Sequence, residues 1–224
     1  MVESTKHKEG EVKKSEHDHR LYRYLRLKNK MKVLLVHDEA ITKSAATLYV
    51  RSGSLNDPPK VNGIAHFCEH MLFLGTKKYP DPAGYGKWLA SNGGTRNAAT
   101  GEDFTFFFFD VKSEALDEAL DRFSDFFKDP LFTEESTQNE LSAIESEFSK
   151  NTSSELRRVI QIEKTELTAE DSALHRFATG NKKSLEEDPQ KKDIKIRDCL
   201  FEYYKNHYSS NIMSLCVVGK ESLD

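Results

Sequence analysis

Apolar residues follow two different spacings along this chain, and each spacing predicts a different kind of element. Short runs rich in β-branched and aromatic residues, bounded by turn residues, predict strands. These strands are expected over residues 20–26, 31–37, 45–52, 95–100, 104–111 and 212–218. Apolar residues three and four positions apart predict helices. The helices are expected over residues 64–74, 83–92, 113–130, 133–150, 156–167, 173–177 and 194–208.

The order of these elements predicts an α+β domain, with an antiparallel-rich sheet and helices packed on one face. The run over 104–111 is apolar on both faces, which predicts a strand buried between layers. Two stretches are expected to lack regular structure: 53–59, which contains two prolines, and the charged stretch 181–192.

The domain boundaries follow from polarity at the start of the chain. Residues 1–19 are almost all polar and predict a disordered tail, which leaves one folded domain over 20–224. The chain stops about one turn into what resembles a further helix start, which favours a domain truncated at its C-terminal end.

Composition narrows the possible partners. The 224 residues carry a net charge of −4, which gives no case for a nucleic-acid partner. No apolar run approaches the roughly 18 residues that cross a bilayer, so no membrane is expected. Three cysteines without a C-x-x-C pair favour reduced thiols, and the cytoplasm is the expected compartment. His7, His17 and His19 lie in the polar tail, where solvated side chains are favoured over a metal site.

The strongest chemical signal is the run His66-Phe67-Cys68-Glu69-His70. On a helix, His70 lies about 40° and Glu69 about −60° from His66, so the three side chains share one face. Two imidazoles so placed can chelate a metal ion, and Glu69 can then act on a water molecule beside it. Cys68 points away, at about 200°. The alternative is a chance grouping on an ordinary amphipathic helix, and a third ligand would decide between the two.

The helix predicted over 133–150 offers carboxylates for that third position. Glu140 and Glu147 are seven residues apart and border its apolar stripe, so either could bind the ion while the other supports a ligand. A solvated acidic helix is the alternative interpretation. Glu102 and Asp103, in a turn, are weaker candidates.

Several motifs in the same order resemble the insulin-degrading enzyme (insulysin) group of the M16 inverzincin metallopeptidases. They are the run over 53–59, the H-x-x-E-H run continuing to Pro80, the segment from Glu140 to Asn151, and the stretch 208–211. In that family 76 residues separate the H-x-x-E-H motif from the third zinc ligand, and 76 residues separate His70 from Glu147 here. The resemblance covers about residues 20–224.

The resemblance implies a zinc metalloendopeptidase that hydrolyses peptide bonds in short or unfolded polypeptides. It implies that His66, His70 and Glu147 are the Zn²⁺ ligands, that Glu69 is the general base, and that Glu140 supports the ligands. In the family an N-A-x-T edge strand binds the substrate as an added strand, and Asn97, Ala98 and Thr100 match it. A plain turn residue is the alternative for Asn97.

One departure from the family pattern is visible in the following strand. Close relatives place tyrosines there, whereas this chain has Phe106, Phe107, Phe108 and Phe109, so phenolic hydrogen bonds are absent.

The resemblance also implies partners. Family enzymes enclose a chamber with about four such units, so the remaining C-terminal domains of a full-length chain, peptide substrates and a possible homodimer of the full-length enzyme are expected. We therefore expect this chain to bind zinc but to have little or no peptidase activity alone. The competing hypotheses are a catalytically inactive structural homologue and an organellar processing peptidase. An inactive homologue usually lacks ligands, and the insulysin-like flanking motifs count against a processing peptidase.

Overall fold

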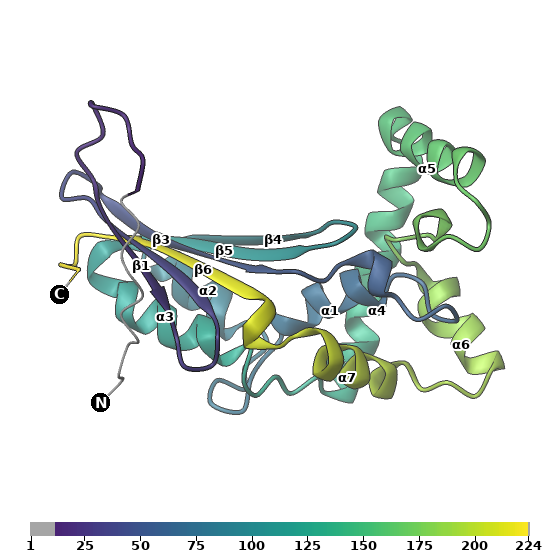
Figure 1. Ribbon diagram of the computed structural model, residues 1–224. Helices are drawn as coiled ribbons and strands as arrows, with labels where there is room; N and C mark the ends of the chain where they lie inside the picture. The colour runs from purple at the N-terminus through teal and green to yellow at the C-terminus, as the bar shows by residue number, and fades with distance from the viewer. Residues whose placement is uncertain (1–11, 224) are drawn as a thin grey trace.

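The computed structural model describes residues 12–223, and these residues form one six-stranded sheet with helices on one side (Figure 1). Along the sheet the strand order is β1-β2-β6-β3-β5-β4. The strands are β1 (Leu21–Arg26), β2 (Lys32–His37), β3 (Lys43–Val50), β4 (Thr95–Thr100), β5 (Thr105–Lys112) and β6 (Met213–Gly219).

Strand pairing is antiparallel except at one position. The β1–β2, β3–β5, β3–β6 and β4–β5 pairs are antiparallel, whereas β2 and β6 are parallel. The last strand therefore inserts between two strands from the start of the chain. The order leaves β4 with a partner on one side only, so its other edge is open.

The helices gather below the sheet and beyond one of its ends (Figure 1). They are α1 (Ile64–Leu72), α2 (Gly84–Ser91), α3 (Leu116–Asp125), α4 (Glu134–Thr152), α5 (Glu155–Leu167), α6 (Asp188–Lys191) and α7 (Ile196–His207). Helices α2 and α3 lie under the strands, α1 and α7 lie side by side, and α4 and α5 stand at the far end. The arrangement confirms the predicted α+β fold.

The core lies between the sheet and the helices under it. Its largest fully buried side chains include those of Phe67, Phe107, Phe109, Ile64, Leu72 and Leu200. These come from α1, β5 and α7, so the core joins the first and last parts of the chain. Helix α1 lies in the centre of this core.

The prediction that β5 is buried on both faces is wrong. Phe107 and Phe109 are buried, but the alternate residues are not: Phe106 is half-buried and Phe108 is 36% exposed. Phe104, Phe106 and Phe108 stack on one another at ring distances of 5.9 and 5.8 Å. The second apolar face of β5 is thus an aromatic row packed within its own sheet surface, and the run of phenylalanines did not reveal that.

Two stretches expected to be irregular contain helical turns. Residues Ser54–Asn56 form a 3₁₀ turn, and Lys183–Glu187 form a π-helical segment that continues into α6. Pro189 is the second residue of α6 and directly follows the π-helical segment. The stretch 181–192 is rich in Lys and Glu, which are good helix formers, so its charge alone does not predict a loop.

The expected disordered tail over 1–19 lies partly outside the described residues. Within the described part, Asp18 accepts hydrogen bonds from the side chains of Arg20 and Tyr22. No helix among the described residues is long and apolar enough to span a membrane.

Candidate metal centre

Helix α1 presents its two histidines because its other face is fully buried. Phe67, Cys68, Met71 and Leu72 are at most 1% exposed and fix the rotation of the helix. His66 and His70 are half-buried on the opposite side. Cys68 points into the core, as predicted.

The start of α1 is held by Asp57, which lies seven positions before the first residue of the helix. Gly63 precedes the helix with φ of 90°, a conformation that favours glycine, and offers no side chain as a cap. Instead the Asp57 carboxylate accepts hydrogen bonds from the backbone N–H groups of Gly63 at 2.6 Å and Ala65 at 2.9 Å. Burial raises the pKa of Asp57 to about 7, against these two donors, which favour the carboxylate.

Helix α4 supplies the carboxylates. Thr133 caps it by accepting a hydrogen bond from the Ser136 backbone N–H, and buried Leu141 and Ile144 fix its inner face. Glu140 and Glu147 both face α1, as their spacing predicted.

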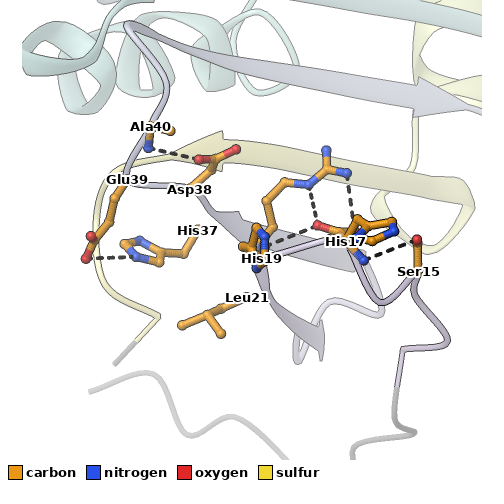
Figure 2. Close-up of a pocket in the computed structure, with 10 residues that line it drawn as sticks. Ser15, His17, His19, Leu21, His37, Asp38, Glu39 and Ala40 are labelled. Carbon is orange, nitrogen blue, oxygen red and sulfur yellow. Dashed lines mark hydrogen bonds and ion pairs between the residues drawn. The ribbon is translucent and has the colours of Figure 1, made fainter.

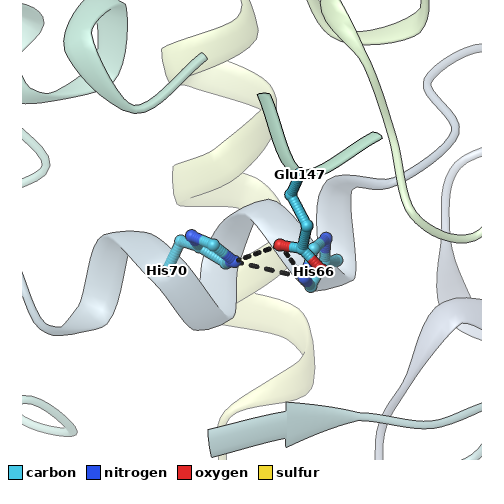
Figure 3. A group of neighbouring side chains, drawn as sticks. All are labelled: His66, His70 and Glu147. Atoms are coloured by element: carbon cyan, nitrogen blue, oxygen red, sulfur yellow. Dashed lines mark hydrogen bonds and ion pairs between the residues drawn. The ribbon is translucent and has the colours of Figure 1, made fainter. Parts of the chain in front are cut away.

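The ligand atoms of His66, His70 and Glu147 converge (Figure 3). The two Nε2 atoms are 3.1 Å apart, and Glu147 Oε2 lies 3.6 Å from that of His66 and 3.5 Å from that of His70. Ligands at about 2.0–2.2 Å from a tetrahedral zinc ion lie about 3.3–3.5 Å from one another. The three residues therefore fit zinc with only small shifts.

The opposite nitrogen of each imidazole is held by an oxygen. His66 Nδ1 donates to the Thr179 carbonyl at 2.7 Å, and His70 Nδ1 donates to Glu140 Oε1 at 2.7 Å. Both acceptors require the proton on Nδ1, so both Nε2 lone pairs are directed at the same point. This is the tautomer that metal binding needs at each ring.

The site attracts positive charge. The hydrogen bond to His70 lowers the pKa of Glu147 to about 2, although burial works against it. Burial works to lower the pKa of His70, but the hydrogen bonds to Glu140 and Glu147 and the charge of Glu69 outweigh it and raise this pKa to about 9. Both shifts follow from carboxylates that stabilise positive charge between the two rings.

Glu69 lies beside the ligands without joining them. Its side chain is buried, and its Oε2 accepts a hydrogen bond from Thr100 Oγ1 at 2.5 Å. Thr100 ends strand β4, whose open edge runs along the same cleft with Asn97 and Ala98. Asn97 itself is exposed and accepts a hydrogen bond from the Ala98 backbone N–H.

A cleft of about 930 Å³ joins these parts. Besides the residues already named, α5 contributes Arg157, Ile160 and Lys164 to its wall. Sequence reasoning missed these residues and Thr179. Thr179 acts through a backbone carbonyl, which no side-chain pattern reports. The charges of α5 resemble those of any solvated helix, so only its position in space distinguishes it.

The weaker candidates do not join the centre. Glu102 pairs with Lys164 at 2.8 Å, and Asp103 is exposed. His17 and His19 line a separate hollow of about 700 Å³ with His37 (Figure 2). In that hollow the His37 ring is hydrogen-bonded to the Glu221 carbonyl. Within residues 12–223 the three histidines form no metal-binding group. His7 lies outside the described residues.

Comparison with known proteins agrees with this geometry. Residues 32–176 match the model of the family described as Insulinase (Peptidase family M16). The insulin-degrading enzymes of Drosophila melanogaster and Homo sapiens are 48% and 46% identical to this chain, each over 95% of it and 21% of their own length. The crystal structure of pitrilysin superposes with a TM-score of 0.90 at 32% identity, over 95% of this chain and 22% of pitrilysin. The chain thus spans about a fifth of the length of the relatives it matches.

Proposed function

Because the chain belongs to the insulinase family, peptidase family M16, we propose that it is the zinc-binding domain of a metalloendopeptidase acting on short or unfolded polypeptides. One observation carries the proposal. Two imidazole Nε2 lone pairs and one Glu147 oxygen converge within 4.8 Å, and the Nδ1 proton of each imidazole is fixed by a separate acceptor.

In this proposal His66, His70 and Glu147 hold the ion, and Glu140 and the Thr179 carbonyl orient the two rings. A zinc ion there supplies Lewis-acid chemistry, because it polarises a carbonyl and lowers the pKa of water toward about 7. Proton transfer and substrate binding are then left to residues of the chain itself.

Glu69 is the proposed general base. It adjoins His70 in sequence but belongs to none of the ligand contacts, so its carboxylate is available to take a proton from water and later return it to the leaving amine. Thr100 donates to its Oε2, which holds the carboxylate in place and leaves the other oxygen for the transfer. Glu69 is therefore positioned by β4, the strand that we propose binds the substrate.

Strand β4 is the proposed substrate platform. Its open edge pairs with no other strand among the described residues, and a peptide added there beside Asn97, Ala98 and Thr100 as a further strand runs past Glu69. Backbone pairing reads an extended shape more than a sequence, which suits short or unfolded polypeptides.

Zinc stoichiometry tests the metal site. We expect about one zinc per chain in the wild type and a large loss in His66→Ala, with the circular dichroism spectrum unchanged. A folded wild-type chain that binds no zinc would overturn the proposal in favour of a structural role.

Peptide cleavage tests the reaction. The relatives are about five times longer than this chain, and in our proposal efficient cleavage also needs the further domains present in them. We expect little cleavage of a fluorogenic peptide by the 224 residues alone, and cleavage that Glu69→Gln abolishes when such C-terminal domains are supplied. Robust cleavage by the chain alone would contradict the requirement for those domains, and cleavage that survives Glu69→Gln would contradict the role of the base. A cytoplasmic location and a homodimer of the full-length enzyme remain predictions.

A further inference from the structure

The cleft around the metal centre contains cationic side chains that have no role in the proposed reaction. Four cationic side chains line it: Arg96, Arg157, Arg158 and Lys164. Lys164 pairs with Glu102, but the other three make no ion pair within residues 12–223. The cleft therefore differs from the molecule as a whole, which has a net charge of −4.

The carboxylates that line the cleft are already engaged. Glu147 faces the two histidines, Glu140 accepts from His70, and Glu69 accepts from Thr100. Four carboxylates balance the four cationic side chains, so the two charges of a bound zinc ion leave the cleft net positive. A peptide entering it meets arginines that make no ion pair within residues 12–223.

Arg96 is held in a position that favours an anion. It is half-buried on β4, with its guanidinium 4.4 Å from the ring centre of Phe73 and 5.8 Å from that of Tyr85. Aromatic faces offset part of the cost of removing a cation from water, but they accept none of its five N–H groups strongly. A carboxylate from a ligand would supply the missing hydrogen bonds.

Arg157 stands at the other side of the cleft, in the first turn of α5. It lines the same cleft as Glu147, the carboxylate of the proposed metal site. It is exposed, and its guanidinium can turn toward an arriving side chain.

We propose that Arg96 and Arg157 are specificity residues that select peptides carrying an acidic side chain near the cleaved bond. This inference rests on the proposed peptidase function and names its substrate class.

Strand geometry gives the place of the Arg96 subsite, whereas Arg157 lies in the α5 wall of the cleft that also contains Glu147. Arg96, Ala98 and Thr100 alternate with exposed residues and share one face of β4, so Arg96 lies about 13 Å along the strand from Thr100 and Glu69. An acidic side chain about four residues from the cleaved bond would meet Arg96. One next to that bond would meet Arg157.

The test measures peptide binding, not turnover. The zinc-loaded Glu69→Gln chain is titrated into nonapeptides that carry a neutral fluorophore and an amidated C-terminus, so that the varied side chain is their only carboxylate. One glutamate is moved along an otherwise neutral sequence, and each peptide is compared with its glutamine counterpart by fluorescence anisotropy. We expect the glutamate peptides to bind about threefold to tenfold more tightly at one or two positions, as for a partly exposed charge pair.

Variants assign those positions. Arg157→Gln should remove the preference at one position and Arg96→Gln at a position about four residues away, with weaker discrimination at high salt. Arg51→Gln removes the same charge from an exposed arginine outside the cleft and should change neither. Equal binding of glutamate and glutamine peptides, or a preference that survives both cleft variants, would overturn the proposal.

Different results would contradict the proposed function and the acidic preference. A chain without zinc contradicts the proposed function itself. A zinc-loaded chain that binds neither kind of peptide contradicts the assignment of peptides to this cleft, and the acidic preference with it. Binding without discrimination removes only the role of the two arginines.

Discussion

The two imidazoles of the metal centre depend on different partners for their orientation. His66 donates to a main-chain carbonyl, which no substitution at Thr179 removes, whereas His70 donates to the Glu140 side chain. The two rings can therefore be tested separately, because the acceptor of His70 can be removed by substituting Glu140, whereas the acceptor of His66 can only be displaced by moving the backbone.

We expect Glu140→Ala to weaken zinc binding about 10-fold to 100-fold, because His70 then loses the acceptor that fixes its tautomer and raises its basicity. Competition against a chromophoric chelator measures the affinity. Glu135→Ala, which removes an exposed carboxylate from the same helix, is the matched control. Equal losses in the two variants would point to a general effect of charge on α4.

Asp57 links the stability of the chain to pH. Its pKa rises from 3.8 when unfolded to about 7 in the buried site, so between these values the folded chain holds a proton that the unfolded chain has released. The stability that this group contributes is present in full below about pH 4 and is lost as pH rises through 7.

Asp57→Asn should remove this slope. We expect the free energy of unfolding of the wild type, measured in urea without metal, to fall relative to that of the variant between pH 5 and pH 8. Other titrating groups cancel in the difference. Asp103→Asn, at an exposed position, should leave the difference flat, and a flat difference for Asp57→Asn as well would show that its carboxyl titrates normally.

At the scale of elements, α1 is held against the loop that carries Thr179. A Cβ added at Gly63 would lie 2.3 Å from the Gly180 Cα, and both glycines have positive φ, 90° and 78°. This backbone contact brings the Thr179 carbonyl to His66. The metal centre therefore depends on a glycine pair as well as on its ligands.

We expect Gly63→Ala to destabilise the fold by about 2 kcal/mol or more, because it combines a left-handed backbone with a backbone clash. Zinc affinity should fall as well, since His66 loses its acceptor. Gly84→Ala is the control: its added Cβ meets only the Asp81 side chain, at 3.2 Å, and it lies at a helical position. Urea denaturation and chelator competition measure both effects, and a Gly63→Ala chain as stable as the control would contradict the argument.

The sequence predicted the elements that carry the site well, because their signals are local. Helical spacing placed His66 and His70 on one face, and the Thr133 cap and the stripe of α4 placed Glu140 and Glu147. Spacing alone left those two glutamates as alternatives for the third ligand, and the geometry now groups Glu147 with the histidines.

The missed features depend on contacts between distant segments. The Thr179 carbonyl meets His66 across 113 positions, and the Gly63–Gly180 contact is equally remote in sequence. A run of phenylalanines predicts burial on both faces of β5, but it does not show which neighbours cover each face, and one face is partly exposed. Periodicity reports which residues share a face, not what that face meets.

At the scale of the whole molecule, the metal cleft has one firm wall and one loosely held wall. Helix α1 lies in the core, whereas α5 has no buried residue, and its Leu156 and Leu167 are 69% and 80% exposed. The ion pair between Lys164 and Glu102, at 2.8 Å, ties α5 to the turn that joins β4 to β5. The loosely held wall is therefore coupled to strand β4.

Hydrogen exchange should reveal this difference in stability across the cleft. We expect amides of α5 to exchange far faster than those of α1, since local opening of α5 exposes little apolar surface. Lys164→Gln should speed exchange in α5 and in residues 101–104 by a further twofold to fivefold, about what a surface ion pair contributes. Lys78→Gln breaks a comparable pair, with Asp121, away from the cleft and should leave both segments unchanged. If α5 were instead as protected as α1, the cleft would be a rigid groove, and peptides would have to enter it without any movement of this helix.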